Sequence, residues 1–201
     1  MRYWKVLVSV ILVLLFAGCG TKEGTATRPI YKNGDKVELT NVYGNQKLTL
    51  LRKDGGFVLE SDPKKMVILD IFGTFCGPCQ SEAPKITNFV NKNRDNFVFI
   101  GLNYLEDVTN DYVVKNFTEK FAAYYFIANK SNGHNNDKLV DTIAHDIGYP
   151  SAIQVPFKVV LKDGKYQKLT DTEGDDPNIQ YYIGAVDLNI IQSDIDKILK
   201  R

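Results

Sequence analysis

The 201-residue chain has only three cysteines and two histidines, the residues that crosslink small folds or bind metals. Three cysteines are too few for a disulfide scaffold. A structural zinc site needs about four ligands, and His134 and His145 accompany only one close cysteine pair, so we predict no metal and no cofactor. His134 is expected in a solvent-facing loop and His145 on a helix surface. The net charge of +1 gives no reason to expect nucleic acid as a partner.

The start of the chain contains no apolar run long enough to span a membrane as a helix. The run 6–17, preceded by Arg2 and Lys5, is interrupted only by Ser9 and is shorter than the roughly 20 residues that a membrane-spanning helix needs. A short apolar run behind basic residues is typical of a signal peptide. We therefore expect the rest of the chain to be exported. The full sequence is 44% hydrophobic, which suffices for one packed domain.

The residues that end this run carry a second signal. Phe16-Ala17-Gly18-Cys19 resembles the lipobox of bacterial lipoproteins, although Phe16 stands where leucine is more usual. This resemblance implies that 1–18 is a lipoprotein signal peptide and that Cys19 is lipidated and anchors the chain to a membrane. An ordinary signal peptide or an uncleaved anchor is the alternative. Residues 19–35 include a small, polar stretch, which predicts a flexible tether before a domain at 36–201.

The motif Cys76-Gly77-Pro78-Cys79 lies where an apolar run, 66–72, gives way to a helical pattern at 78–93. Two cysteines with this spacing at the first turn of a helix can form a disulfide. The free N–H groups of the helix N-terminus stabilise a thiolate, so one sulfur becomes nucleophilic and the other can resolve a mixed disulfide. The motif predicts thiol-disulfide exchange, with Cys76 as the exposed nucleophile because it is nearer the helix end.

A purely structural role for this cysteine pair is less favoured. A disulfide that closes so small a loop constrains the unfolded chain little and therefore adds little stability. In an exported protein, two close cysteines of this kind indicate redox chemistry in preference to a staple or a zinc site.

Alternating strand and helix patterns predict an α/β fold with a mixed sheet flanked by helices. Pro84 lies inside the first predicted helix, where we expect a kink. Asp163-Gly164 predicts a hairpin turn. Strands are expected at 36–41, 46–51, 57–59, 66–72, 96–103, 125–128, 157–161 and 166–170, and helices at 78–93, 111–124, 137–147 and 188–199.

From Lys36 onward the chain resembles the thioredoxin fold, and within it the TlpA/ResA/CcmG-like extracytoplasmic thiol-disulfide oxidoreductases. The motif matches the active-site dipeptide of thioredoxin, and Asp70 and Pro84 fall where thioredoxins have a buried acid and a helix kink. Val155-Pro156 resembles the loop with a cis-proline that faces the cysteines. The 76 residues between Cys79 and Pro156 agree with the inserted βα unit of that group.

Further residues receive roles from chemistry and resemblance together. Asp70, within an apolar strand, is predicted to be a buried base for the resolving thiol, the alternative being a structural role. Glu82 either tunes the thiols or lies on a solvated helix face, and Phe75 is expected to shield the disulfide. A cis Val155-Pro156 bond would let a substrate peptide pair as an added strand, with a trans bond as the alternative. Gly77 and Pro78 complete the predicted substrate-binding surface.

Together these features predict a lipid-anchored, extracytoplasmic disulfide reductase that acts on exported proteins with cysteine pairs. The resemblance implies a membrane electron donor of the DsbD/CcdA type and apocytochrome c thiols as substrate. Two alternatives remain open. The same cysteines could serve an oxidase or isomerase of higher potential, or the chain could be a non-enzymatic holder of unfolded thiol-containing proteins.

Overall fold

The computed structural model describes residues 30–130 and 136–200. The predicted signal peptide, the lipidation residue Cys19 and His134 lie outside these ranges. The last residues of the predicted tether lie within them. The Tyr31 backbone N–H donates to Thr142 Oγ1 at 3.0 Å, and Lys138 Nζ lies 4.0 Å from the centroid of the Tyr31 ring. The packed domain therefore begins before Lys36.

The strands form two sheets. A three-stranded antiparallel sheet contains β1 (Lys36–Thr40), β2 (Lys47–Lys53) and β3 (Gly56–Leu59). A six-stranded mixed sheet has the order β6-β5-β4-β7-β8, with β9 paired to β7. Its strands are β4 (Met66–Phe72), β5 (Phe97–Asn103), β6 (Phe126–Ala128), β7 (Phe157–Lys162), β8 (Lys165–Tyr166) and β9 (Tyr182–Ile183).

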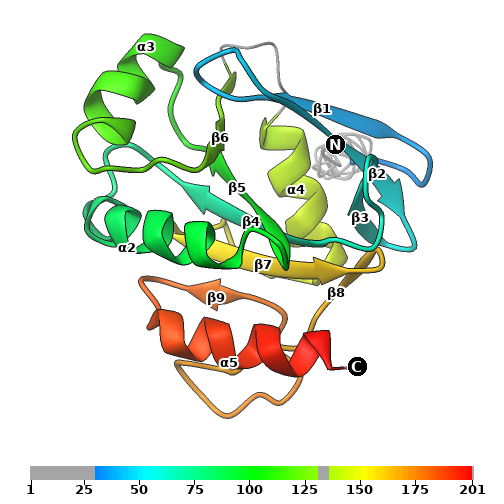
Figure 1. Ribbon diagram of the computed structural model, residues 1–201. Coiled ribbons are helices and arrows are strands. Elements are labelled where there is room, and N and C mark those ends of the chain that lie inside the picture. Colours follow the sequence, from blue (N-terminus) through cyan, green and yellow to red (C-terminus); the bar gives the residue numbers. More distant parts are fainter. Residues whose placement is uncertain (1–29, 131–135, 201) are drawn as a thin grey trace, which may run out of the picture.

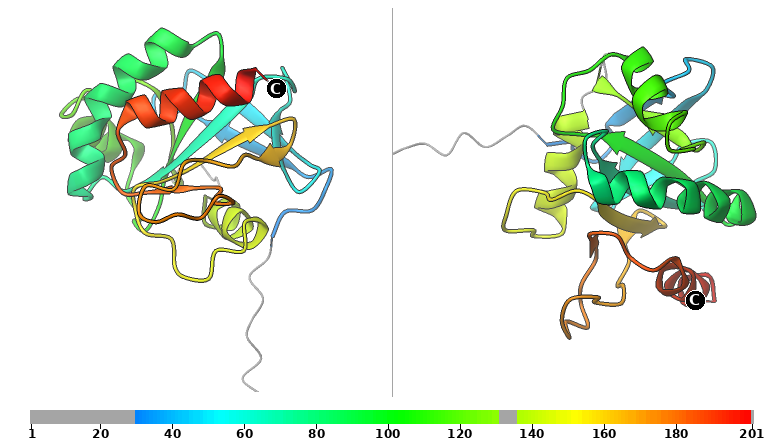
Figure 2. Two further views of the ribbon diagram at one scale, coloured as in Figure 1. Left: turned by 90° about the horizontal axis from the view of Figure 1, so that it is seen from below. Right: turned by 90° about the vertical axis from the view of Figure 1, so that its left-hand side faces the viewer.

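Helices cover both faces of the mixed sheet (Figure 1). Helices α2 (Gly77–Asn93) and α5 (Leu188–Leu199) lie on one face, and α4 (Asn136–Asp146) lies on the other with the three-stranded sheet. Figure 2 shows the same arrangement from below and from the side. No helix within 30–130 or 136–200 is long and apolar enough to cross a membrane.

Two hydrophobic clusters correspond to these layers. The first contains both cysteines of the motif and packs α2 and α5 against the sheet. The second joins the opposite face of the sheet to α4 and to the three-stranded sheet. Strand β4 is buried along its whole length and contributes to both clusters, because alternate side chains of a strand point to opposite faces. The predicted α/β fold with a mixed sheet and an N-terminal hairpin is confirmed.

A buried ion pair ties the three-stranded sheet to α4. Arg52, on β2, donates from Nη1 and Nη2 to the two carboxylate oxygens of Asp146 at 2.6 Å each. The side chains are 7% and 5% exposed, respectively. Tyr166 Oη donates to the same carboxylate at 2.9 Å. This bidentate ion pair fixes the position of the three-stranded sheet on the rest of the domain.

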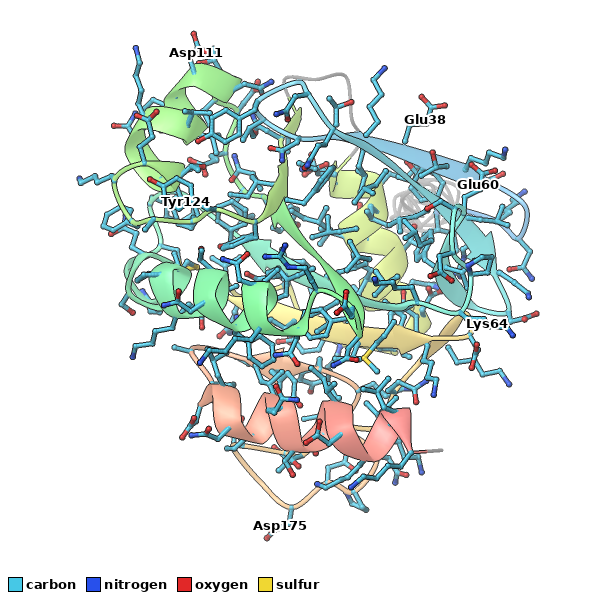
Figure 3. The ribbon with its side chains drawn as sticks, in the orientation of Figure 1. Glu38, Glu60, Lys64, Asp111, Tyr124 and Asp175 are labelled. Carbon is cyan, nitrogen blue, oxygen red and sulfur yellow. A yellow bond between two sulfur atoms is a disulfide. The ribbon has the colours of Figure 1, made fainter. Side chains whose placement is uncertain are left out.

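The predicted helix at 111–124 is only partly correct. Helix α3 spans Asn110–Val113 and continues as a π-helical turn, η1, over Val114–Thr118. The chain then turns, with Ala122 in the left-handed region at φ 52°. Thr87 on α2 holds this turn, since its Oγ1 donates to Ala122 O at 2.6 Å and accepts from Tyr124 N at 2.9 Å. Figure 3 shows Tyr124 close to α2.

The predicted strand 166–170 is also shorter than expected. Strand β8 ends at Tyr166, and the chain leaves β7 because Thr170 bonds to α5 instead. The Thr170 N–H and hydroxyl donate to the carboxylate of Asp194 at 2.6 and 2.9 Å. The long connection that follows projects away from the sheet, with Asp175 at its tip (Figure 3), and returns as β9, a strand the sequence pattern did not reveal.

Candidate active site

The two cysteines of the motif form a disulfide at the start of α2, with a Cα–Cα distance of 5.2 Å. Cys76 is the N-cap residue, and its Sγ accepts from the Cys79 N–H at 3.2 Å. Pro78 lies in the first turn, where its missing N–H costs no helical hydrogen bond. The Cys76 sulfur is therefore the atom that faces the unsatisfied N–H groups of the helix, as the sequence predicts.

Both sulfur-bearing residues are largely covered in this disulfide form. Cys76 is 6% exposed and Cys79 is 2% exposed, which corrects the expectation of an exposed Cys76. Cys76 is nevertheless the more accessible of the two. Gly77 and Pro78, which lie between them, are exposed. The part of Gly77 and Pro78 in substrate binding stays a prediction.

The loop before the cysteines is held by a residue that we did not predict. Glu106 accepts from the Thr74 N–H at 2.5 Å and from the Thr74 hydroxyl at 2.7 Å. Gln80 Nε2 donates to Thr74 O at 2.7 Å from the other side. Phe75 is 58% exposed, and its ring lies so close to Gly73 that a Cβ on the glycine would be 2.6 Å from it. The role of Phe75 as a shield of the sulfurs stays a prediction.

The Val155-Pro156 peptide bond is cis, as predicted. Pro156 is buried, and its carbonyl accepts from the Gly184 N–H at 2.9 Å, which places the loop beside β9. Val155 is half-buried and packs against the hydrophobic cluster that contains Cys76 and Cys79. Val155 thus joins the loop to the cluster that holds the cysteines, and the part of the loop in substrate binding stays a prediction.

Behind the cysteines, three charged side chains meet inside the domain. Asp70 on β4 is paired in register with Lys158 on β7, so their side chains emerge on the same face of the sheet. Lys158 Nζ lies 3.2 Å from Asp70 Oδ1 and 2.5 Å from Glu82 Oε1. Glu82 follows Cys79 by three residues and thus lies on the same face of α2. Asp70 and Lys158 are each 1% exposed and Glu82 is 6% exposed.

This burial changes the acidities of the group. Burial raises the pKa of Asp70, and the charge of Lys158 only partly offsets it. Burial likewise raises the pKa of Glu82 to about 7, with Lys158 opposing and Asp70 reinforcing the rise. Burial alone would lower the pKa of Lys158, but the two carboxylates raise it, so this lysine stays charged. The site therefore holds a charged lysine and two carboxyl groups whose pKa values are both raised by burial.

These positions settle several expectations. Asp70 is buried, as predicted. Glu82 is buried against Lys158, so the solvated helix face offered as its alternative is wrong. His145 lies on the surface of α4, as expected, with a side chain 66% exposed. Lys158 was missed, although a lysine in the apolar run Phe157-Lys158-Val159-Val160 is the same signal that drew attention to Asp70.

Comparisons with known proteins agree with this geometry. Residues 57–145 match the thioredoxin family model. Thioredoxin-T of Drosophila melanogaster is 29% identical over 115 residues, which cover 56% of this chain and 72% of the relative. Two solved structures share the fold. StoA from Bacillus subtilis has a TM-score of 0.52 at 16% identity, covering 82% of this chain and 98% of its own. A thioredoxin-family thiol:disulfide interchange protein from Chlorobium tepidum has a TM-score of 0.50 at 20% identity, covering 86% and 95%.

A disulfide-bonded cysteine pair that begins at the N-cap of a helix, in a fold that also holds a cis-proline loop and a buried acid, is suited to thiol-disulfide exchange. Together with the family match, they show that the chain carries a thioredoxin domain with a redox-active disulfide. Residues 57–145, which match the thioredoxin family model, therefore carry a cysteine pair that can perform thiol-disulfide exchange.

One prediction concerns the buried acid. Asp70→Asn is expected to leave the fold intact, because Lys158 keeps its partner Glu82. The variant should slow the step in which Cys79 loses its proton by about 10²-fold, the usual contribution of a general base. Stopped-flow release of an aromatic thiolate from its disulfide at pH 7 separates the first attack from this second step. An unchanged second phase would mean that Asp70 is structural.

Proposed function

We propose that this protein is a membrane-anchored extracytoplasmic disulfide reductase that acts on exported proteins. The observation that carries the proposal is the Cys76 sulfur at the N-cap of α2, joined to Cys79 one turn further on. The helix N-terminus stabilises the Cys76 thiolate more than the Cys79 sulfur, so the two thiols of the reduced form differ in reactivity.

The reaction follows from this asymmetry. The Cys76 thiolate attacks one sulfur of a substrate disulfide, forming a mixed disulfide and releasing the first substrate thiolate. The Cys79 thiol then gives its proton to Asp70, attacks Cys76 Sγ and releases the second substrate thiolate. Two electrons pass from the cysteine pair to the substrate, and the enzyme is left with the Cys76–Cys79 disulfide described above.

The direction of transfer is inferred from the dipeptide between the cysteines. Gly77-Pro78 is also the dipeptide of thioredoxin, whose potential is about −270 mV, whereas a strong oxidant of this superfamily lies near −120 mV. A reductase in an oxidising compartment needs a continuous supply of electrons. We propose a membrane donor of the DsbD/CcdA type, and cysteine pairs of exported proteins, such as those of apocytochrome c, as the substrates.

The proposed location rests on the start of the chain. The apolar run 6–17 and the lipobox-like Phe16-Ala17-Gly18-Cys19 support export and anchoring through a lipid on Cys19.

The reduction potential tests the proposed direction. Equilibration of the full chain with glutathione buffers, in a Cys19→Ser background, is expected to give a potential near −270 mV. In cells, acid quenching followed by alkylation should find Cys76 and Cys79 reduced while the donor is present and oxidised when it is deleted. A potential near −120 mV with a pair that stays oxidised would favour the oxidase alternative. Full function of a Cys76→Ser, Cys79→Ser double variant in cells would favour a non-enzymatic holder.

A further inference from the structure

Lys158 has no role in the reaction as written so far, yet its ammonium contacts both buried carboxylates. Its ammonium lies 3.2 Å from Asp70 Oδ1 and 2.5 Å from Glu82 Oε1, and its own side chain is 1% exposed. Because β4 and β7 are antiparallel neighbours, the Asp70–Lys158 pairing fixes this bridge in the register of the sheet. Glu82 connects the bridge to the helix that carries the cysteines.

The charges of this group do not balance when all three residues are ionised. One ammonium and two carboxylates carry a net charge of −1 in a region removed from water, which is unfavourable unless a proton is taken up. Among the described residues, Glu82 Oε2 is buried without a hydrogen-bond partner, and Asp70 Oδ1 has none beyond its ion-pair contact. These two oxygens are free to carry the additional proton.

Assuming the reductase function above, we propose that Lys158 is a positioning residue that makes Asp70 and Glu82 share one proton, and that Asp70 serves Cys79 while that proton lies on Glu82. The raised pKa values of both carboxyl groups agree with this sharing. Lys158 favours the ionised form of Asp70, and a protonated Glu82 no longer repels it. Asp70 is thereby ionised and ready to accept a proton inside an apolar core.

The other charged or titratable groups around the pair are consistent with this assignment. Lys85 lies on the exposed side of α2 and lowers the pKa of Glu82 only slightly. Tyr125 is buried beside both carboxyl groups, and burial together with their charge raises its pKa well above the usual value, so it stays neutral. Asp187 faces the same helix from the loop before α5 and is occupied as the N-cap of α5, where it accepts from Asn189 N.

A pocket connects Glu82, but not Asp70, to the surface. Its volume is about 370 Å³, and it lies between α2 and the loop before α5. Its lining residues are Ser81, Glu82, Lys85, Ala185, Val186, Asp187 and Leu188. Because Glu82 lines this pocket, its carboxyl group is the one that we infer to exchange protons with solvent. The proton that Asp70 takes from Cys79 therefore has a route to solvent through the pair, after the substrate thiolate has left.

In the resolving step, the Cys79 S–H bond breaks, the proton moves to Asp70, and the Cys79 sulfur displaces the substrate thiolate from Cys76 Sγ. Both carboxyl groups are then protonated, and the buried group carries the charge of Lys158 alone. One proton returns to solvent through Glu82 before the next cycle. No reagent other than the two cysteine thiols and the substrate disulfide is needed.

The test measures the pH dependence of the resolving step in single turnovers with an aromatic disulfide, whose first and second thiolates report Cys76 and Cys79. All variants carry Cys19→Ser. Lys158→Met removes the cation at similar volume, so Asp70 ionises less readily. The pH midpoint of the resolving rate should therefore rise by at least about one unit, and the rate at pH 7 should fall about tenfold. Glu82→Gln places the remaining negative charge on Asp70, so the midpoint should move down, with a rate at pH 5.5 about threefold above wild type.

Lys85→Met is the matched control, since it removes a lysine from the same pocket without touching the buried pair, and its midpoint should stay close to that of wild type. Circular dichroism verifies that each variant is folded. Shifts of opposite sign support the proposal. The proposal is overturned if the pH midpoint is unchanged in folded Lys158→Met. It is also overturned if the pH midpoint of Glu82→Gln is unchanged or higher than that of wild type. If Lys158→Met does not fold, Glu82→Gln alone decides. A wild-type protein that releases no thiolate at any pH would instead refute the reductase function.

Discussion

Replacing Cys76 with serine is expected to lower the rate of disulfide reduction at least about a thousandfold, because the serine hydroxyl stays protonated at neutral pH and is a far weaker nucleophile than a thiolate. The loss should appear in the first phase of the single-turnover reaction. Stability should change little, since the Cys76–Cys79 disulfide spans a sequence separation of three and constrains the unfolded chain only weakly.

Cys79→Ser provides the comparison for this variant. It should keep the first phase and lose the second, because Cys76 can still attack but no thiol remains to resolve the adduct. Equal loss of the first phase in both variants would contradict the assignment of Cys76 as the nucleophile. A large fall in the melting temperature of either variant would instead show that the disulfide is a structural staple.

A second large effect is expected away from the cysteines, at the buried ion pair between β2 and α4. Asp146→Ala leaves the Arg52 guanidinium buried, 7% exposed, without its two-pronged partner. Removing one member of such a pair typically costs about 3–5 kcal/mol of unfolding free energy. Tyr166 also loses the carboxylate that its hydroxyl donates to. Urea denaturation followed by circular dichroism measures the change.

The matched control is Glu60→Ala, which removes a carboxylate from the surface pair with Lys36. Both side chains of that pair are exposed, so the stability of this variant should remain close to that of wild type. If Asp146→Ala were no more destabilising than Glu60→Ala, the buried pair would not hold the small sheet on the domain.

Local chemistry explains which features the sequence predicts well. The helix after the cysteines begins at Gly77 and ends at Asn93, close to the predicted 78–93, because Cys76 caps it and Pro78 fits its first turn. The C-terminal helix spans Leu188–Leu199 as predicted, since its apolar residues repeat at helical spacing. The cis Val155-Pro156 bond was predicted from its place before a strand in a matching fold, and it is present.

Features that depend on contacts between distant segments were harder to predict. Glu106 reaches Thr74, 32 residues earlier, and Lys158 reaches Glu82, 76 residues earlier. Neither contact leaves a local pattern, because the first joins the loops that follow β4 and β5 and the second joins strand β7 to helix α2. Similarly, the predicted helix at 111–124 ended early because Thr87 of another element holds Ala122 in a turn.

The central claim, that Cys76 attacks substrate disulfides and Cys79 resolves the product, is tested most directly by trapping the intermediate. The reduced full chain carrying Cys19→Ser and Cys79→Ala is mixed with a peptide containing one disulfide, and the products are mapped by mass spectrometry. We predict one stable adduct, joined through Cys76, while the protein with both cysteines releases reduced peptide and ends as the Cys76–Cys79 disulfide. Absence of an adduct at Cys76, or an equally fast adduct at Cys79 in a Cys76→Ala variant, would contradict the account.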